Sequence, residues 1–240
     1  MNRGGKKVSI LNVLCAGAAR GLVRALQDRF TEETDATVRG SFGAVGAIKE
    51  ALLAGESCDV MIGSAAVIDE LVCSSELRGD LLGNLGYVYT GLSIRADAIV
   101  PVISTPQALK TSLLAADSYY VADPFRATAG IHFASVLKRL GIYDTVADRI
   151  RGFPNGATAM RELAATKGPD LVGCTQITEI NYTEGVRLVG RLPPPFELAT
   201  LYTAAVTSES VQPELAARFV TLFAGAESLP LRSKEGFGPV

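Results

Sequence analysis

Hydrophobic and polar residues follow a repeating order along this chain: a short apolar run, a loop of small residues, then an amphipathic segment. Residues 8–14 are apolar almost throughout, as in a buried strand, and apolar residues recur at helical spacing over residues 22–30. Two further strands are predicted at residues 36–42 and 58–62. Strands and helices that alternate at this spacing predict right-handed crossovers and a parallel sheet of the α/β class.

Four of the predicted helices begin directly after a loop of small residues. These loops lie at residues 15–19, 43–46, 128–130 and 154–158. Small residues let a ligand approach the backbone, and the first turn of a helix offers unpaired N–H groups and a positive dipole end. Ligands in such sheets bind beyond the carboxyl ends of the strands, where these loops would meet. The pattern predicts a convergent anion site, although each loop by itself is more typical of an ordinary βα turn.

Two segments mark places where the chain could cross between two halves of the molecule. Residues 85–94 form a long strand-like run without helical period, and residues 193–195 are consecutive prolines, which stiffen a connection. We therefore expect two lobes hinged around a ligand cleft, the first of residues 1–88 plus 192–240 and the second of residues 89–191. A single continuous doubly wound sheet is the alternative.

Composition and charge narrow the function classes. The 240 residues are 48% hydrophobic and 20% charged, as in an ordinary globular protein, and the net charge is −2. Without a basic field, a nucleic acid is not expected as a partner. Scattered cysteines without a CxxC pair, and His132 as the only histidine, predict neither a metal site nor a disulfide framework.

The N-terminal sequence bears on location. Basic residues precede a short apolar run that leads directly into the first predicted strand, which is too short and too integrated for a secretory signal. No apolar run approaches the roughly 20 residues that a membrane span requires. We expect no membrane span and a cytoplasmic location, or a periplasmic one if a signal peptide is missing from this chain.

Several segments resemble periplasmic molybdate-binding proteins in order and spacing. They are LCAGAARGLVRALQDRF, SFGAVGAIKEALLAGESCDVMIGSA, VADPFRATAGIHFASVLKRLGIYDTV and the tail SLPLRSKEGF. The resemblance covers nearly the whole chain. It implies the two-lobed type II periplasmic-binding-protein fold, with a small anion held between the lobes by helix starts and hydroxyl groups.

The chain departs from the molybdate pattern at the ligand positions that the resemblance implies. Where those proteins carry a serine after the first strand, this chain has Ala18, and where the second segment supplies a serine hydroxyl, it has Ala44 and Val45. The late tyrosine of that family falls near Thr175. Most of the hydroxyl cage for a tetrahedral oxyanion is therefore absent, and molybdate is not the expected ligand.

Two arginines lie close to the same loops. Arg20 follows the first loop and Arg126 lies within PFRATAG. Guanidinium groups bind carboxylates bidentately, so one arginine from each lobe would suit a ligand with at least two carboxylates. Either arginine could instead be a solvated surface charge. The polar residues expected to orient the ligand, each also a candidate cap or turn residue, are Ser64, Thr128, Asn155, Thr175 and Gln176.

The resemblance includes a branch of enzymes, aconitate isomerase, in which this type of cleft acts on a tricarboxylate. The first hypothesis is accordingly a cytoplasmic, cofactor-independent isomerase of a small unsaturated di- or tricarboxylate, working by a 1,3-proton shift. The catalytic base is left unassigned, because the candidates each have a common structural role: His132, Cys15, Cys174 and Lys49.

The second hypothesis is a solute-binding receptor for a small anion, with a transporter as partner only if the chain is exported. A third is an intracellular oxyanion buffer, which the loss of the serines disfavours.

Overall fold

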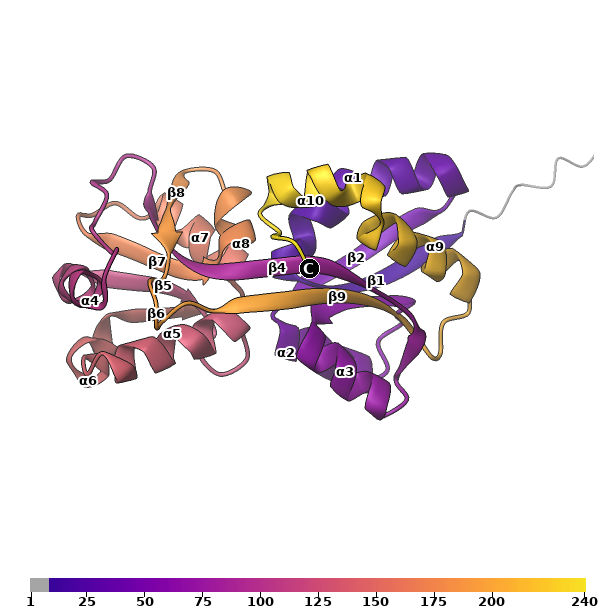
Figure 1. The fold of residues 1–240 in the computed structure, drawn as a ribbon, viewed down its shortest axis with the longest axis horizontal. Coiled ribbons are helices and arrows are strands. Elements are labelled where there is room, and N and C mark those ends of the chain that lie inside the picture. The colour runs from indigo at the N-terminus through magenta and orange to yellow at the C-terminus, as the bar shows by residue number, and fades with distance from the viewer. Residues whose placement is uncertain (1–8) are drawn as a thin grey trace, which may run out of the picture.

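The computed structural model describes residues 9–240 as one mixed sheet shared by two lobes, with helices on both faces (Figure 1). The strand order is β2-β1-β3-β9-β4-β7-β5-β6, and β8 pairs with β4 beside this path. The strands are β1 (Ile10–Ala16), β2 (Thr37–Gly43), β3 (Val60–Ser64), β4 (Leu77–Arg95), β5 (Ser118–Ala122), β6 (Ile150–Phe153), β7 (Leu171–Gln176), β8 (Val186–Arg191) and β9 (Ala199–Thr207).

The helices flank the strands of each lobe. In the first lobe α1, α9 and α10 lie on one side and α2 and α3 on the other, and in the second lobe α7 and α8 lie opposite α5 and α6 (Figure 1). Their bounds are α1 (Arg20–Thr34), α2 (Val45–Leu53), α3 (Ala65–Cys73), α4 (Pro106–Ala115), α5 (Thr128–Arg139), α6 (Tyr143–Val146), α7 (Gly156–Ala165), α8 (Ile177–Asn181), α9 (Pro213–Ala224) and α10 (Leu229–Glu235). Short 3-10 turns are η1 (Gly17–Ala19), η2 (Ala147–Arg149) and η3 (Ala226–Ser228).

β4 is the element that joins the two lobes. Its first part pairs antiparallel with β9, from Leu77 opposite Thr207 to Tyr89 opposite Ala199. Its last part pairs antiparallel with β7 and β8. Figure 1 shows β4 running from one lobe into the other. The crossing predicted within residues 85–94 is therefore confirmed, as is the two-lobed α/β fold.

Each lobe has its own hydrophobic core. In the first, the rings of Phe30 and Phe219 meet edge to face with centroids 5.1 Å apart. In the second, Tyr119 and Phe133 are fully buried neighbours with centroids 6.0 Å apart. Leu192 packs with the second core. The boundary expected between residues 191 and 192 stays a prediction, and it lies close to the connection that returns the chain to the first lobe.

The sheet differs from the expected parallel one. β1, β2 and β3 are parallel, as are β5, β6 and β7, but β4, β8 and β9 pair antiparallel. β4 links the lobes, while β9 pairs with its first part and β8 with its last part. Four helices and strands were not predicted: β6, α6, α8 and α10. β6 and α8 are too short for a hydrophobic period to show.

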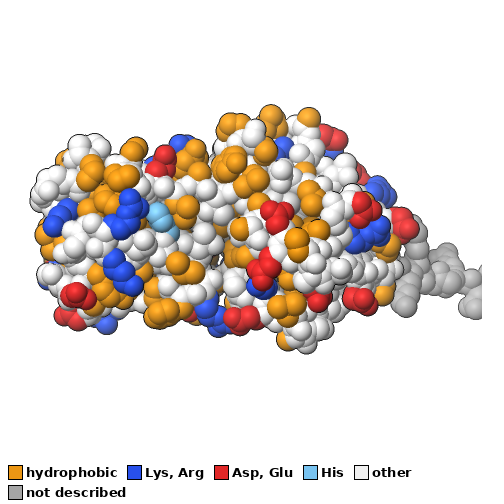
Figure 2. All heavy atoms as spheres, turned by 60° about the horizontal axis from the view of Figure 1, so that its bottom comes forward, with side chains coloured by type: hydrophobic (Ala, Val, Ile, Leu, Met, Phe, Trp, Pro, Cys, Tyr) orange, Lys and Arg blue, Asp and Glu red, His pale blue; other side chains and the backbone are white. Residues whose placement is uncertain are grey.

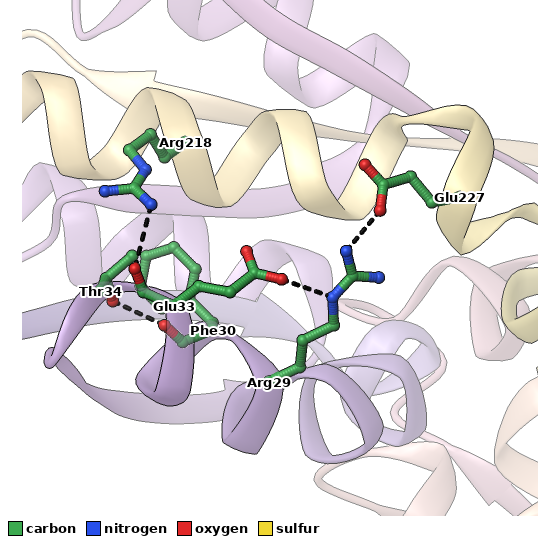
Figure 3. A network of polar contacts seen from close by, with 6 residues as sticks. All are labelled: Arg29, Phe30, Glu33, Thr34, Arg218 and Glu227. Atoms are coloured by element: carbon green, nitrogen blue, oxygen red, sulfur yellow. Dashed lines mark hydrogen bonds and ion pairs between the residues drawn. The ribbon is translucent and has the colours of Figure 1, made fainter.

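A polar network fastens α1 to the C-terminal part of the chain (Figure 3). Arg29 of α1 binds Glu33 with 2.6 Å between Nε and Oε1, and it also pairs with Glu227. Arg218 of α9 donates to the backbone oxygen of Glu33 at 3.2 Å. Because exposed ion pairs stabilise a fold only slightly, the buried ring of Phe30 beneath them supplies most of the stabilisation.

The surface agrees with the modest net charge. On the face in Figure 2, acidic and basic side chains occur on both lobes among hydrophobic ones, without a field of one sign across the molecule. Within residues 9–240, no helix is both long and apolar enough to cross a membrane. The N-terminal residues on which the expected cytoplasmic location depends, 1–8, lie outside the described part of the chain.

Gly130 gives the sharpest test of the packing at the start of α5. Alanine usually favours a helix over glycine by about 1 kcal/mol, but a Cβ at this position would collide with the backbone oxygens of Ala122 and Asp123. We expect Gly130→Ala to lower the free energy of unfolding by about 1–3 kcal/mol, measured by urea denaturation. Gly152→Ala is the control, because its Cβ would meet only Pro124 Cδ at 3.6 Å. Equal stability of the two variants would contradict the packing described.

Candidate functional site

A small cavity lies where the two lobes meet, and the four small-residue loops converge on it. The first lobe contributes the turn around Gly17 and the start of α2 at Val45, and the second contributes the starts of α5 at Thr128 and of α7 at Gly156. The cavity volume is about 20 Å³, about the space of one water molecule. The remaining lining residues are Ala16, Ala18, Gly43, Ala44, Ala122, Ala127, Ala129, Asn155, Thr175, Gln176, Glu179 and Tyr202.

The helix starts around this cavity leave backbone N–H groups available. Ala16 before η1, Ala44 before α2 and Ala127 before α5 have no side chain that could cap the helix. Only Asn155 caps its helix, accepting from the Thr158 amide at 2.8 Å. Uncapped N–H groups and the positive helix ends favour an anion, and here two lobes supply them to one space.

Glu179 is the acidic group of the cavity. Its side chain reaches the cavity from α8, and the residue is only 5% exposed. Thr175 Oγ1 donates to Glu179 Oε2 at 2.5 Å. A Cβ at Gly17 or Gly156 would collide with the Glu179 carboxylate, so both loops approach it as closely as they do only because they carry glycine.

The environment of Glu179 favours its neutral form more than water does. Burial raises the pKa of the Glu179 carboxyl above its ordinary value. The hydrogen bond from Thr175 and the backbone amides of Ala157 and Gln176 oppose that shift, because they stabilise the carboxylate. Among the described residues, no ion pair involves Glu179. It is therefore a single buried carboxyl whose charge can change within the cavity.

Two further polar side chains face the cavity, one from each lobe. Gln176 ends β7 and is 3% exposed, and neither atom of its amide has a hydrogen-bond partner. Tyr202 of β9 is 2% exposed. The Gln176 amide lies close enough to the Tyr202 hydroxyl to lower its pKa slightly, without the geometry of a hydrogen bond. Burial and the charge of Glu179 outweigh this and raise the pKa of Tyr202, so its hydroxyl stays protonated.

Of the seven residues expected at the site, four line the cavity: Thr128, Asn155, Thr175 and Gln176. Asn155 uses its side chain as a helix cap, and Thr175 uses its hydroxyl on Glu179. Ser64 is buried at the start of α3, outside the lining, and its side chain makes no capping bond.

The two arginines lie outside the cavity lining. Arg126 is exposed and forms an ion pair with Glu50 of the other lobe, while its backbone oxygen accepts from the Gly46 amide at 3.2 Å. Arg20 begins α1, and its guanidinium carbon lies 5.2 Å from the centre of the Phe42 ring. Arg20 Nε is buried without a hydrogen-bond partner. Arg126 thus connects the two lobes in this structure, and a contact of either arginine with the ligand remains a proposal.

The side chains weighed as bases from the sequence are all placed elsewhere. His132 Nε2 lies 2.8 Å from the Phe196 backbone oxygen, and burial lowers the pKa of His132. Burial raises the pKa of both Cys15 and Cys174 well above the ordinary range, which disfavours the reactive thiolates. Lys49 pairs with Glu70 at 2.6 Å. Within residues 9–240, no three His, Cys, Asp or Glu side chains are grouped so as to hold a metal.

Glu179 was the residue that sequence reasoning missed. It lies in ITEIN, a five-residue helix directly after β7, and no apolar period marks so short an element. The available signal was position: a carboxylate three residues beyond Gln176, at a strand end already expected to face the ligand. One turn of helix brings such a residue back over the strand end.

The comparisons with known proteins agree on the fold. The family model described as bacterial extracellular solute-binding protein matches residues 11–238. Aconitate isomerase from a Pseudomonas species is 27% identical over 242 residues, covering 97% of this chain and 89% of that protein. The molybdate-binding protein ModA of Escherichia coli K12 is 25% identical over 198 residues, covering 79% and 75%.

Solved structures are similar over nearly the whole chain. A periplasmic molybdate-binding protein from Azotobacter vinelandii has a TM-score of 0.77 at 18% identity, covering 96% of this chain and 99% of that one. The sulfate-binding protein SubI from Mycobacterium tuberculosis H37Rv also has a TM-score of 0.77, at 17% identity, covering 97% and 87%. At these identities the likeness shows the fold.

The raised pKa of Glu179 makes stability depend on pH. Its folded-state pKa lies above the unfolded value, so the native state holds the proton more tightly. Its contribution to stability is fully present below the unfolded pKa and is lost as pH rises through the folded pKa. We expect Glu179→Gln, which cannot ionise, to become progressively more stable than the wild type as pH rises through this window, measured by urea unfolding at a series of pH values.

The exposed Glu184→Gln variant is the matched control, and its stability profile should run parallel to that of the wild type. A Glu179→Gln profile that also stays parallel would show that Glu179 is not held in a desolvated site.

Proposed function

Because this chain belongs to the bacterial extracellular solute-binding protein family, whose two lobes enclose a ligand cleft, we propose that its own cleft isomerises a small unsaturated di- or tricarboxylate. The observation that carries the proposal is the buried Glu179 carboxyl at the junction of the lobes. A carboxyl whose pKa is raised above its ordinary value is a stronger base than a solvated carboxylate and is suited to accept a proton and return it. The 27% identity with aconitate isomerase supports the same reaction class.

The reaction is a 1,3-proton shift. The Glu179 carboxylate takes a proton from the CH₂ group beside the substrate double bond, and the C–H electron pair forms a new double bond. The former double-bond pair moves toward the adjacent carboxylate, whose oxygens carry the charge of an enolate. The Glu179 carboxylic acid then returns the proton to the far carbon. The double bond has moved by one position, and no atoms or electrons are gained or lost.

The helix starts would hold the substrate during this cycle. Uncapped N–H groups of α2 in the first lobe and α5 in the second can each donate hydrogen bonds to a substrate carboxylate, and the small residues there leave room for close approach. Carboxylates bound on both lobes would place the uncharged carbon chain between them, beside Glu179. Proximity of this kind supplies a large part of catalysis. Thr128, Asn155, Thr175 and Gln176 are the proposed substrate-binding residues in the lining, whereas Arg20, Ser64 and Arg126, expected at the site from the sequence, lie outside it.

A receptor for a small anion is the second candidate, favoured by the family and by the 25% identity with ModA. A molybdate-like ligand suits this cavity poorly, because Ala18, Ala44 and Val45 carry no hydroxyl and Glu179 places an acidic group beside the anion. A receptor for a carboxylate fits the same helix starts. The two candidates also differ in location, since the isomerase is proposed for the cytoplasm and a receptor would work outside it beside a transporter.

Proton NMR in D₂O separates the two functions. With cis- and trans-aconitate first in a panel of unsaturated carboxylates, we expect the wild type to form an isomer or to carry deuterium into the substrate. Glu179→Gln should lower the rate by at least about 10²-fold while leaving binding of the same carboxylate measurable, because the amide cannot accept the proton. Glu184→Gln should match the wild type.

Line broadening of a carboxylate without isomer or deuterium in the wild type would favour the receptor. Full activity of Glu179→Gln would remove Glu179 as the base and leave the isomerase hypothesis to be tested on other residues.

The role of Arg126 can be tested against that of its partner. We expect Arg126→Gln and Glu50→Gln to weaken binding of cis-aconitate by similar factors of less than about tenfold in calorimetric titrations, because an exposed ion pair contributes about 1 kcal/mol or less to closure. A loss of about 10²-fold confined to Arg126→Gln would instead assign the guanidinium to the ligand, as the sequence predicts. Lys138→Gln, a cation in the last turn of α5, controls for net charge.

A further inference from the structure

The cavity contains a buried amide whose hydrogen-bonding capacity is unused. Within residues 9–240, buried side-chain atoms without a partner occur in Arg20, Thr90, Gln176, Thr178, Thr200 and Arg232, and of these residues only Gln176 lines the cavity. Both its amide nitrogen and its amide oxygen are unpaired. A buried polar group without a partner destabilises the fold, so its presence here points to a partner that arrives with the ligand.

Tyr202 stands beside this amide and comes from the other lobe. It is fixed in the first-lobe core, where its ring meets Phe237 edge to face with centroids 6.4 Å apart. Its register places it opposite Ser64 of β3 and Gly86 of β4, next to the strands that link the lobes. Its hydroxyl is held protonated by burial and by the acidic group of Glu179. It is therefore positioned as a hydrogen-bond donor that does not give up its proton to solvent.

We propose that Gln176 and Tyr202 together form the oxyanion-stabilising pair of this site, donating hydrogen bonds to the substrate carboxylate on which enolate charge develops. The proposal depends on the isomerisation proposed above and adds to it the two groups that stabilise its intermediate. The base and the donors have separate tasks. Glu179 moves the proton, while the amide N–H and the phenol O–H bind an oxygen that becomes more negative as the proton leaves the carbon.

The two donors come from different lobes, which gives the cleft a way to couple closure with chemistry. Gln176 ends β7 of the second lobe and Tyr202 lies on β9 of the first. Both donors can bind the same substrate oxygen only when the two lobes are closed. The pair is therefore assembled by closure, and the same closure excludes water from the enolate.

Conservative variants test this directly on the full chain. We expect Tyr202→Phe and Gln176→Leu each to lower kcat for cis-aconitate by about 10²–10³-fold, with KM changed by less than about tenfold, because the lost hydrogen bond strengthens only in the transition state. Gln176→Leu should unfold at the same or a higher urea concentration than the wild type, because it removes an unpaired buried amide. A residue needed only for folding would not combine higher stability with lower kcat.

Tyr119→Phe is the matched control, since Tyr119 is equally buried but donates to the Leu113 backbone oxygen in the second-lobe core, away from the cavity. It should lose stability and retain kcat. Wild-type kcat in both Tyr202→Phe and Gln176→Leu, with Glu179→Gln inactive, would overturn the donor pair and leave the isomerase standing. A wild type that isomerises none of the panel would overturn both proposals.

Discussion

The surrounding structure is fitted to one constraint: the Glu179 carboxyl is buried between two lobes, and no cation within residues 9–240 forms an ion pair with it. Removing a charge from water is unfavourable unless hydrogen bonds or dipoles replace the solvent. Here the replacements are the Thr175 hydroxyl and backbone amides at Ala157 and Gln176. These reduce the rise in the Glu179 pKa without abolishing it. The group can therefore exist in both protonation states inside the same small cavity.

The glycines at the cavity follow from the same constraint. A side chain at Gly17 or Gly156 would occupy the volume of the Glu179 carboxylate. These two residues belong to opposite lobes, so the position of the carboxylate depends on the lobes being together. Other cross-lobe contacts lie around it: the Tyr182 hydroxyl donates to the Gly17 oxygen at 3.0 Å, and the Gly46 amide donates to the Arg126 oxygen at 3.2 Å. The closed arrangement of the lobes and the electrostatic environment of Glu179 thus depend on the same contacts.

Under the proposed function, the cavity suits a ligand with uncharged atoms at its centre. Helix starts on both lobes can neutralise negative groups at the ends of a ligand, whereas the middle of the cavity holds alanines and an acidic carboxyl. A compact oxyanion would place its charge against that carboxyl. A chain of carbon atoms with carboxylates at its ends places its charge on the helix starts and a C–H bond near Glu179, which is the arrangement that proton transfer requires.

Sequence patterns alone predict the two-lobed α/β fold, the crossing in β4 and the convergence of four small-residue loops. These features follow from apolar periodicity and from runs of glycine and alanine. Both patterns determine local structure, so they can be recognised in a short stretch of sequence. The same patterns place four residues at the carboxyl ends of the strands, where helices begin: Thr128, Asn155, Thr175 and Gln176.

Which side chains meet inside the cavity depends on tertiary contacts that no local sequence pattern predicts. Arg126 paired with Glu50, 76 residues away, instead of facing the cavity lining, and Glu179 entered it from a helix too short to have a period. Tyr202 reached the same space from β9, far along the chain. Such contacts depend on how the two lobes pack and on which charged groups are buried without a partner. The spacing of residues along one segment contains neither kind of information.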